Sequence, residues 1–235
     1  MTFFLIVPQE DVALLAVDTR VVCFDDRSFW DDGPPKLRRL RGGLMVGTGL
    51  VRWLALVEAA VAPYRASDVD SIGAAIRGVM QGDAIERLRT ERGFANALES
   101  NAGRFGELEI LYRNGAAFAA ASFDDQGNCR RIPAGSVLHS PVRGLDVVTV
   151  ARLLKGMVAR WPQKADTADR CAMIRLAAAF LAELNGLAVA PNGPSDRIEV
   201  AVLGKTPPLL LHIPPTQCAA IGEASDVELL TYSEN

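Results

Sequence analysis

The chain has 235 residues, of which 49% are hydrophobic and 23% are charged, a balance typical of a globular protein. A chain of this length buries enough surface to fold without a metal or disulfide, and no linker divides it, so we expect one domain over residues 1–235. The net charge of −3 leaves no basic excess to match a phosphate backbone, which argues against a nucleic-acid partner.

Short apolar runs open the chain. Residues 3–7 and 12–17 flank a polar turn at 8–11, and residues 21–24 follow, so three short strands are predicted. Residues 25–35 are polar, with two prolines and one glycine, and are expected to form a loop.

A second apolar block follows this loop. Residues 37–41 alternate apolar and basic side chains, as in a half-exposed strand, and residues 44–46 predict a buried strand that leaves through a turn at 47–49. Residues 50–62 are apolar on most faces and end at Pro63, which predicts a buried helix.

The rest of the chain alternates helical and strand patterns. Ser67-Asp68 predicts the N-cap of a helix that runs to about Arg92, with Gly82 as the place where it would break. Asn114-Gly115 is a strong hairpin signal. The later elements expected are strands at 108–113, 116–123, 129–132 and 136–138, helices at 146–161 and 166–184, the second ending at Asn185-Gly186, and strands at 198–203 and 209–213.

The predicted order is therefore strands, two helices, strands, two helices, strands. Apolar strands between two pairs of helices indicate an α+β fold in which packed sheets are covered by helices on both faces.

The compartment is suggested by the cysteines and by the hydropathy. Four scattered cysteines without a CxxC pair suit reduced thiols in a cytosolic protein, at positions 23, 129, 171 and 218. The apolar run at 3–7 follows no basic segment and is too short for a signal peptide, and no stretch approaches the length of a membrane span. We expect a cytoplasmic protein with no membrane partner.

Three features near the start resemble a known active site. Thr2 follows Met1, Asp18-Thr19-Arg20 begins sixteen positions after Thr2, and Lys36 is the second residue of the run PKLRRLRGGLMVGTG. Together they resemble the proteasome β-subunit family of N-terminal-nucleophile hydrolases, and most of all its bacterial HslV-type members, with Anbu and other bacterial homologues also open. The resemblance implies a four-layer α-β-β-α sandwich.

The family's chemistry assigns a role to each matching residue. Once Met1 is removed, the Thr2 hydroxyl would be the nucleophile and its free α-amino group, with a pKa of about 7.7–8.0, the base. Lys36 would supply positive potential, and Asp18 would hold it by a charge-assisted hydrogen bond. The N–H of Gly49 would stabilise the oxyanion.

Other parts of the site are matched less closely. The supporting serine is assigned to Ser136, in a Gly-Ser-Val segment, with Ser195 as a further candidate in a segment whose order differs from the family's. By resemblance, substrate-pocket residues would come from near Val21, Gly47 and Trp53.

Nothing in the sequence calls for a metal or a cofactor. His139 and His212 are the only histidines, and neither has the spacing of a metal site or the partners of a Ser-His-Asp triad. No GxxxxGK[ST] motif accompanies the glycines at 42–49, so a phosphate loop is not expected.

The resemblance therefore implies a threonine-type endopeptidase. It would cut peptides or unfolded proteins inside a homo-oligomeric double ring of six or seven subunits per ring, with an unfoldase ATPase as partner for an HslV-like chain. Two alternatives stay open: a non-catalytic ring subunit with the same fold, and an N-terminal-nucleophile amidohydrolase acting on a small amide.

Overall fold

The computed structural model describes residues 3–22, 29–30, 36–140, 145–162, 167–187, 198–204 and 209–213. Within these residues the fold is α+β, as the sequence predicts, with six helices and two five-stranded antiparallel sheets. A two-stranded pair of β3 (Val21–Val22) and β4 (Phe29–Trp30) completes the strands. The pairing of β4 falls in a segment expected to be loop throughout.

The first sheet is built from the two ends of the chain. Its strands are, in order across the sheet, β10 (Leu138–His139), β1 (Phe4–Pro8), β2 (Ala13–Asp18), β11 (Ile198–Leu203) and β12 (Leu209–Ile213). Phe4 pairs with Val17, and Asp18 pairs with Ile198. Every residue of β1 and β2 is buried, because both faces of this sheet are covered.

The second sheet comes from the middle of the chain. Its order is β5 (Leu37–Leu40), β6 (Gly43–Gly49), β7 (Gly106–Asn114), β8 (Ala117–Asp124) and β9 (Cys129–Ile132). The hairpin predicted at Asn114-Gly115 is confirmed, and Gly115 has the positive φ of 61° that such a tight turn needs. β6 is longer than predicted, because residues 47–49 continue the ladder with β7 instead of turning away.

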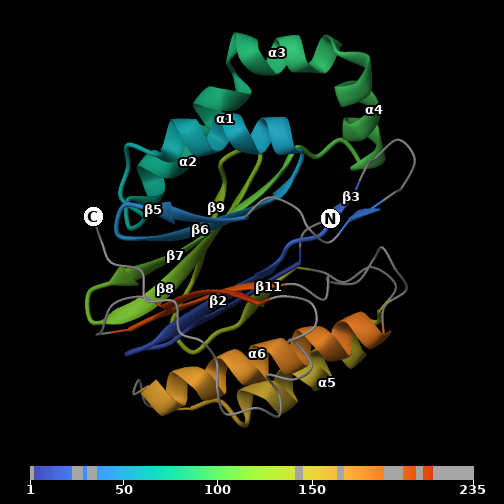
Figure 1. Cartoon of the computed structure of the whole chain (residues 1–235). Coiled ribbons are helices and arrows are strands. Elements are labelled where there is room, and N and C mark those ends of the chain that lie inside the picture. Colours follow the sequence, from blue (N-terminus) through green and yellow to red (C-terminus); the bar gives the residue numbers. More distant parts are fainter. Residues whose placement is uncertain are drawn as a thin grey trace.

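The helices fall into two groups (Figure 1). α5 (Val147–Val158) and α6 (Thr167–Leu187) lie against the first sheet. α1 (Val51–Val61), α2 (Val69–Met80), α3 (Asp83–Thr90) and α4 (Arg92–Ser100) lie on the side of the second sheet. None of the helices in the described ranges is long and apolar enough to cross a membrane.

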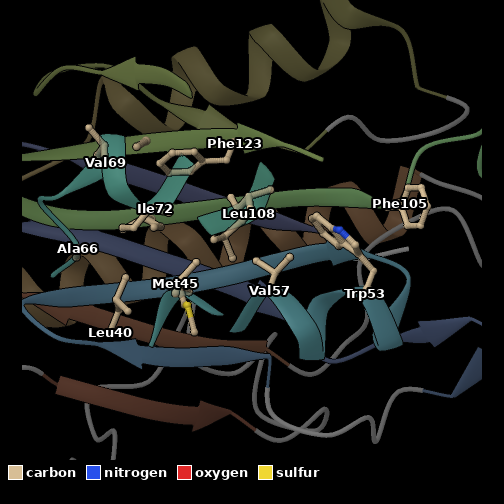
Figure 2. Packing of buried hydrophobic residues seen from close by; sticks show 14 of the residues in the cluster. Leu40, Met45, Trp53, Val57, Ala66, Val69, Ile72, Phe105, Leu108 and Phe123 are labelled. Carbon is tan, nitrogen blue, oxygen red and sulfur yellow. The ribbon is translucent and has the colours of Figure 1, made fainter. Parts of the chain in front are cut away.

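Three apolar clusters hold these parts together. Leu14 of the first sheet packs with Ala177 of α6, and Leu108 of the second sheet packs in the cluster that contains Trp53 of α1 (Figure 2). The third cluster joins the two sheets, with Leu15 from one and Leu111 from the other. The two sheets therefore face each other across a third apolar layer, separate from the two layers that lie between sheets and helices.

The helices α1 to α4 differ from the two helices expected at 50–62 and 67–92. The break predicted at Gly82 is present, but a second break occurs at Glu91, whose ψ of 119° is extended, and α4 follows where no helix was predicted. Phe94 of α4 packs on Phe105 with ring centroids 5.7 Å apart, and Glu91 pairs with Arg52 of α1. These long-range contacts accompany the break, which no proline marks.

Helix ends also depart from the predictions. Asp68 precedes α2 without making the expected side-chain cap, whereas Asp146 caps α5 by accepting from the Thr149 N–H at 2.8 Å. α6 continues to Leu187 through Asn185-Gly186, where an end was predicted.

Glu109 is a buried carboxyl group in the layer between the sheets. Its neighbours Leu108 and Ile110 face the helices, so strand alternation turns Glu109 toward the other sheet. Ser122 donates to its Oε1 at 3.1 Å, while Oε2 has no partner among the described residues. Burial raises the pKa of Glu109 to about 8, and the charge of Glu107 adds to the rise.

Replacing Glu109 by Gln tests this environment. Because the folded-state pKa lies above the ordinary value of 4.5, the contribution of Glu109 to stability is fully present below about pH 4.5 and is lost as the pH rises through about 8. Urea unfolding should show that the wild type loses up to about 1.4 kcal/mol per pH unit in this window relative to Glu109→Gln. Equal pH slopes for the two proteins would contradict the assignment.

Candidate active site

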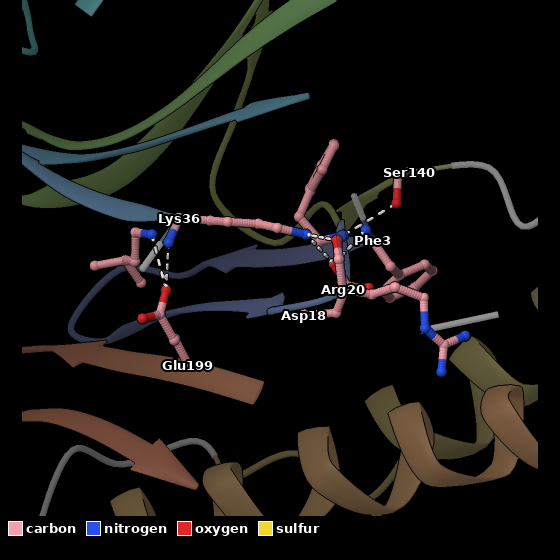
Figure 3. A network of polar contacts seen from close by, with 8 residues as sticks. Phe3, Asp18, Arg20, Lys36, Ser140 and Glu199 are labelled. Carbon is pink, nitrogen blue, oxygen red and sulfur yellow. Dashed lines mark hydrogen bonds and ion pairs between the residues drawn. The ribbon is translucent and has the colours of Figure 1, made fainter. Parts of the chain in front are cut away.

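Strand ends from both sheets meet at one edge of the molecule. Asp18 is the last residue of β2, Phe3 directly precedes β1, and Glu199 is the second residue of β11. Lys36 directly precedes β5 of the other sheet and reaches across to them (Figure 3). A charged group from one sheet is thus held by polar groups of the other.

The pair of Asp18 and Lys36 lies at the centre of this site. Lys36 Nζ is 2.9 Å from Asp18 Oδ1, and the side chains are 12% and 1% exposed. The same Asp18 oxygen accepts the Phe3 N–H at 2.9 Å, and the Asp18 N–H donates to the Phe3 carbonyl at 2.9 Å. The charge-assisted hydrogen bond expected from the sequence is therefore present, and it also ties down the start of β1.

A second acceptor holds the lysine. Lys36 Nζ donates to the backbone carbonyl of Arg20 at 2.6 Å. Burial lowers the pKa of Lys36 below the ordinary lysine value, and the Asp18 carboxylate offsets part of this effect. The ammonium form is thus supported by its two acceptors but loses its proton more readily than a surface lysine would.

Glu199 is a site residue that the sequence reasoning did not find. Its Oε2 accepts the backbone N–H of Lys36 at 2.8 Å and that of Leu37 at 2.9 Å, so one carboxylate joins β11 to the start of β5. The only signal in the sequence was a charged residue inside the apolar run IEVAVL.

The serine near the site is Ser140 rather than Ser136. Ser140 Oγ accepts the Phe4 N–H at 3.0 Å, and the Ser140 N–H donates to the Phe4 carbonyl at 3.2 Å. Ser136 follows Gly135, whose N–H donates to the Pro8 carbonyl at the opposite end of β1. Pro8 lies four strand steps from Phe4, roughly 13 Å, so the structure does not bring Ser136 to Asp18.

The strand predicted at 136–138 begins later in the structure, as β10 at Leu138–His139. Gly135 takes a turn conformation with a φ of 83°, and pairing with β1 begins only at Leu138, opposite Ile6. The antiparallel register then carries Ser140, the last residue of this segment, to the start of β1.

Gly49 lies at the same edge as Lys36. Leu37 pairs with Val46, so Lys36, which directly precedes β5, lies beside the final residues of β6. Gly49 has a φ of 117°, and a Cβ there would overlap the carbonyl oxygen of Phe105. Only glycine suits this backbone position, where the chain passes from β6 toward α1.

Two residues assigned to the substrate pocket face away from the site. A Cβ on Gly47 would meet the Leu54 side chain of α1, so this position points toward the helices. Trp53 is fully buried in the cluster between α1 and the second sheet (Figure 2), where it cannot contact a substrate. Alternation along β6 instead turns Thr48 toward the side between the sheets.

The remaining predicted residues fall outside what the structure describes. Thr2 and Ser195 lie outside the described residues, and the side chain of Val21 does as well; only the backbone pairing of Val21 with Trp30 is defined. In the described part of the chain, no group of three or more His, Cys, Asp or Glu residues gathers in a way that could hold a metal ion.

The Asp18–Lys36 pair can be tested by unfolding. Asp18→Ala leaves a buried ammonium without its carboxylate, so the free energy of unfolding should fall by about 3–5 kcal/mol. Because the two residues interact directly, the double variant Asp18→Ala/Lys36→Met should cost less than the sum of the single variants in urea denaturation. Additive losses would show that the pair is not coupled.

The position of Trp53 gives a second test. Trp53→Ala should lower the free energy of unfolding by about 3–5 kcal/mol, because it empties a filled core site. Val51→Ala on the same helix is the matched control: Val51 is 68% exposed, and its loss should change stability by no more than about 0.5 kcal/mol. Unchanged stability in Trp53→Ala would contradict the core position of Trp53 and favour its assignment to the substrate pocket.

Comparison with known proteins bears on the fold. No known protein family matches the sequence, and no curated protein matches it either. Among solved structures, the chain is similar to the Anbu (Gly-1) mutant from Hyphomicrobium sp. strain MC1, with a TM-score of 0.58 and 11% sequence identity. The similarity covers 94% of this chain and 92% of that one, so it extends over the whole fold, and at this identity it concerns the fold alone.

Proposed function

We propose that the chain is a proteasome-like threonine-type peptidase, built as one domain with a four-layer α-β-β-α sandwich. The observation that carries the proposal is the double use of Asp18 Oδ1, which accepts hydrogen bonds from both Lys36 Nζ and the Phe3 N–H. The similarity in fold to Anbu and the apolar layer between the two sheets support the architecture.

The nucleophile in this proposal is the hydroxyl of Thr2. Residue 2 is covalently bonded to the Phe3 nitrogen, and that nitrogen is 2.9 Å from the oxygen that also holds the lysine. Removal of Met1 would free the α-amino group of Thr2, which then acts as the base with a pKa of about 7.7–8.0. Nucleophile and base therefore belong to one residue beside a buried cation.

The proposed reaction proceeds through an ester. The α-amine takes the proton of the Thr2 hydroxyl, the oxygen attacks the scissile carbonyl, and the amine of the leaving peptide departs with that proton. Water then hydrolyses the ester to release the second product and restore Thr2. The Lys36 ammonium eases loss of the hydroxyl proton by its positive potential.

Backbone groups around the nucleophile complete the proposed site. The N–H of Gly49 is assigned to the oxyanion, a contribution of roughly 2.7–4 kcal/mol where such donors have been removed from other enzymes. Ser140 takes the supporting position first assigned to Ser136, because its hydroxyl fixes the Phe4 N–H next to the start of the chain. Thr48 is proposed as a substrate-side position in place of Gly47 and Trp53.

The proposed setting is a homo-oligomeric ring in the cytoplasm that acts on peptides or unfolded proteins, with an unfoldase ATPase as an HslV-like partner. Exposed apolar side chains support self-association: Val147 and Val148 in the first turn of α5 are 83% and 78% exposed, and Val51 of α1 is 68% exposed.

The decisive experiment is the intact mass of the untagged chain before and after incubation with an α′,β′-epoxyketone peptide. This reagent captures a hydroxyl and a free amine on the same residue. We expect a chain lighter by one methionine that gains one inhibitor mass, and no gain in Thr2→Ala. Lys36→Ala should slow the adduct on the order of 100-fold, because the nucleophile loses its neighbouring charge.

The control is Lys155→Ala, which removes an exposed lysine of α5 and should react like the wild type. A chain that keeps Met1, takes up no inhibitor and still assembles into a ring would replace the peptidase with the non-catalytic subunit. A chain that loses Met1 but remains a monomer or dimer and cuts no peptide would favour the amidohydrolase.

A further inference from the structure

We propose that Glu199 is a positioning residue for Lys36: its carboxylate holds the start of β5 against β11, so that the lysine side chain ends beside Asp18. The inference rests on the proposed function, because only there does Lys36 act on a nucleophile. Glu199 binds the backbone at Lys36 and Leu37, so the proposed role acts through the placement of the lysine.

The contact is specific to two successive backbone groups. Glu199 Oε2 accepts the N–H of Lys36 at 2.8 Å and the N–H of Leu37 at 2.9 Å. β5 is the edge strand of its sheet, so N–H groups on its outer side have no strand partner there. Successive amides that converge on one oxygen form a small anion-binding site, and Glu199 supplies the anion from the other sheet.

Lys36 is consequently fixed at both ends to the first sheet. Its backbone is held by Glu199 of β11, and its Nζ is held by Asp18 of β2 and by the carbonyl of Arg20. β2 and β11 are paired neighbours, with Asp18 opposite Ile198 and Glu199 opposite Val17. The distance that the lysine side chain spans is therefore set by the spacing of two adjacent strands.

Charge gives Glu199 a second effect on the lysine. Burial lowers the pKa of Lys36, whereas the charges of Asp18 and Glu199 raise it, and the charge of Arg20 lowers it. Glu199 therefore favours the ammonium form as well as fixing the backbone. A residue that served only to tie the sheets together would not be expected to control the ionisation of Lys36.

Two substitutions separate the effects of Glu199. Glu199→Gln keeps an oxygen that can accept the two N–H bonds but removes the charge, whereas Glu199→Ala removes both. The full-length assembled protein is labelled with acetic anhydride over a range of pH, and the rate at Lys36 is followed by peptide mass spectrometry. Only the neutral amine reacts, and the chain has four lysines, so the Lys36 peptide is readily distinguished.

Glu199→Gln should shift the labelling profile of Lys36 to lower pH than in the wild type. It should slow the epoxyketone adduct less than Glu199→Ala does. Glu199→Ala should slow the adduct on the order of 100-fold, the loss expected when a reacting group is displaced by about 1 Å. Glu199→Asp, which restores the charge on a shorter side chain, should recover the labelling profile more fully than the adduct rate.

The matched control is Glu109→Gln. Glu109 is also a buried glutamate on a strand, 1% exposed, but it binds Ser122 and is not among the charged groups that shift the pKa of Lys36, so its loss should leave the Lys36 profile unchanged. Glu199 variants with the wild-type profile and the wild-type adduct rate would overturn the inference and leave the peptidase proposal standing. A wild type without an adduct would refute the peptidase and with it the positioning role, while the labelling profile would still show whether Glu199 controls Lys36.

Discussion

The ammonium group of Lys36 is buried where two sheets meet, and the arrangement of this edge follows from that fact. An unpaired charge in such a place would cost several kcal/mol, so the chain must bring acceptors to it. Asp18, the last residue of β2 in the opposite sheet, lies at 2.9 Å, and the carbonyl of Arg20, two residues after that strand, lies at 2.6 Å. Because Asp18 also binds the Phe3 N–H, the position of the cation and the start of β1 are linked.

Two other buried carboxyl groups, Glu199 and Glu109, lie in different surroundings and have different hydrogen-bond partners. Glu199 accepts two backbone N–H groups and lies near a cation, so its charge is compensated. Glu109 accepts one hydrogen bond, from the Ser122 hydroxyl, and its other oxygen has no partner among the described residues. Burial raises the pKa of Glu109 to about 8. Glu199 is therefore suited to anchor two backbone N–H groups, whereas Glu109 is suited to stay protonated near neutral pH.

Fold and function rest on different grounds in this protein. The similarity to Anbu extends over the length of both chains at 11% identity, so the packing of the layers tolerates nearly complete replacement of side chains. A shared fold does not by itself establish an activity. The proposed peptidase depends instead on a few polar contacts at one edge, and the side chains that take part in them can be replaced one at a time.

Local patterns in the sequence determined the α+β class, the hairpin at Asn114-Gly115 and most strands, because periodicity and turn residues act over a few positions. The resemblance singled out Asp18 and Lys36, which the structure pairs. Only the tertiary structure showed that Ser140, and not Ser136, lies beside the start of β1, and that Glu199 binds the backbone of Lys36. It also placed Trp53 on the helix-covered side of the second sheet. Ser140 meets Phe4 across 136 positions and Glu199 meets Lys36 across 163, and contacts of this kind depend on strand register and sheet packing, which no local pattern encodes.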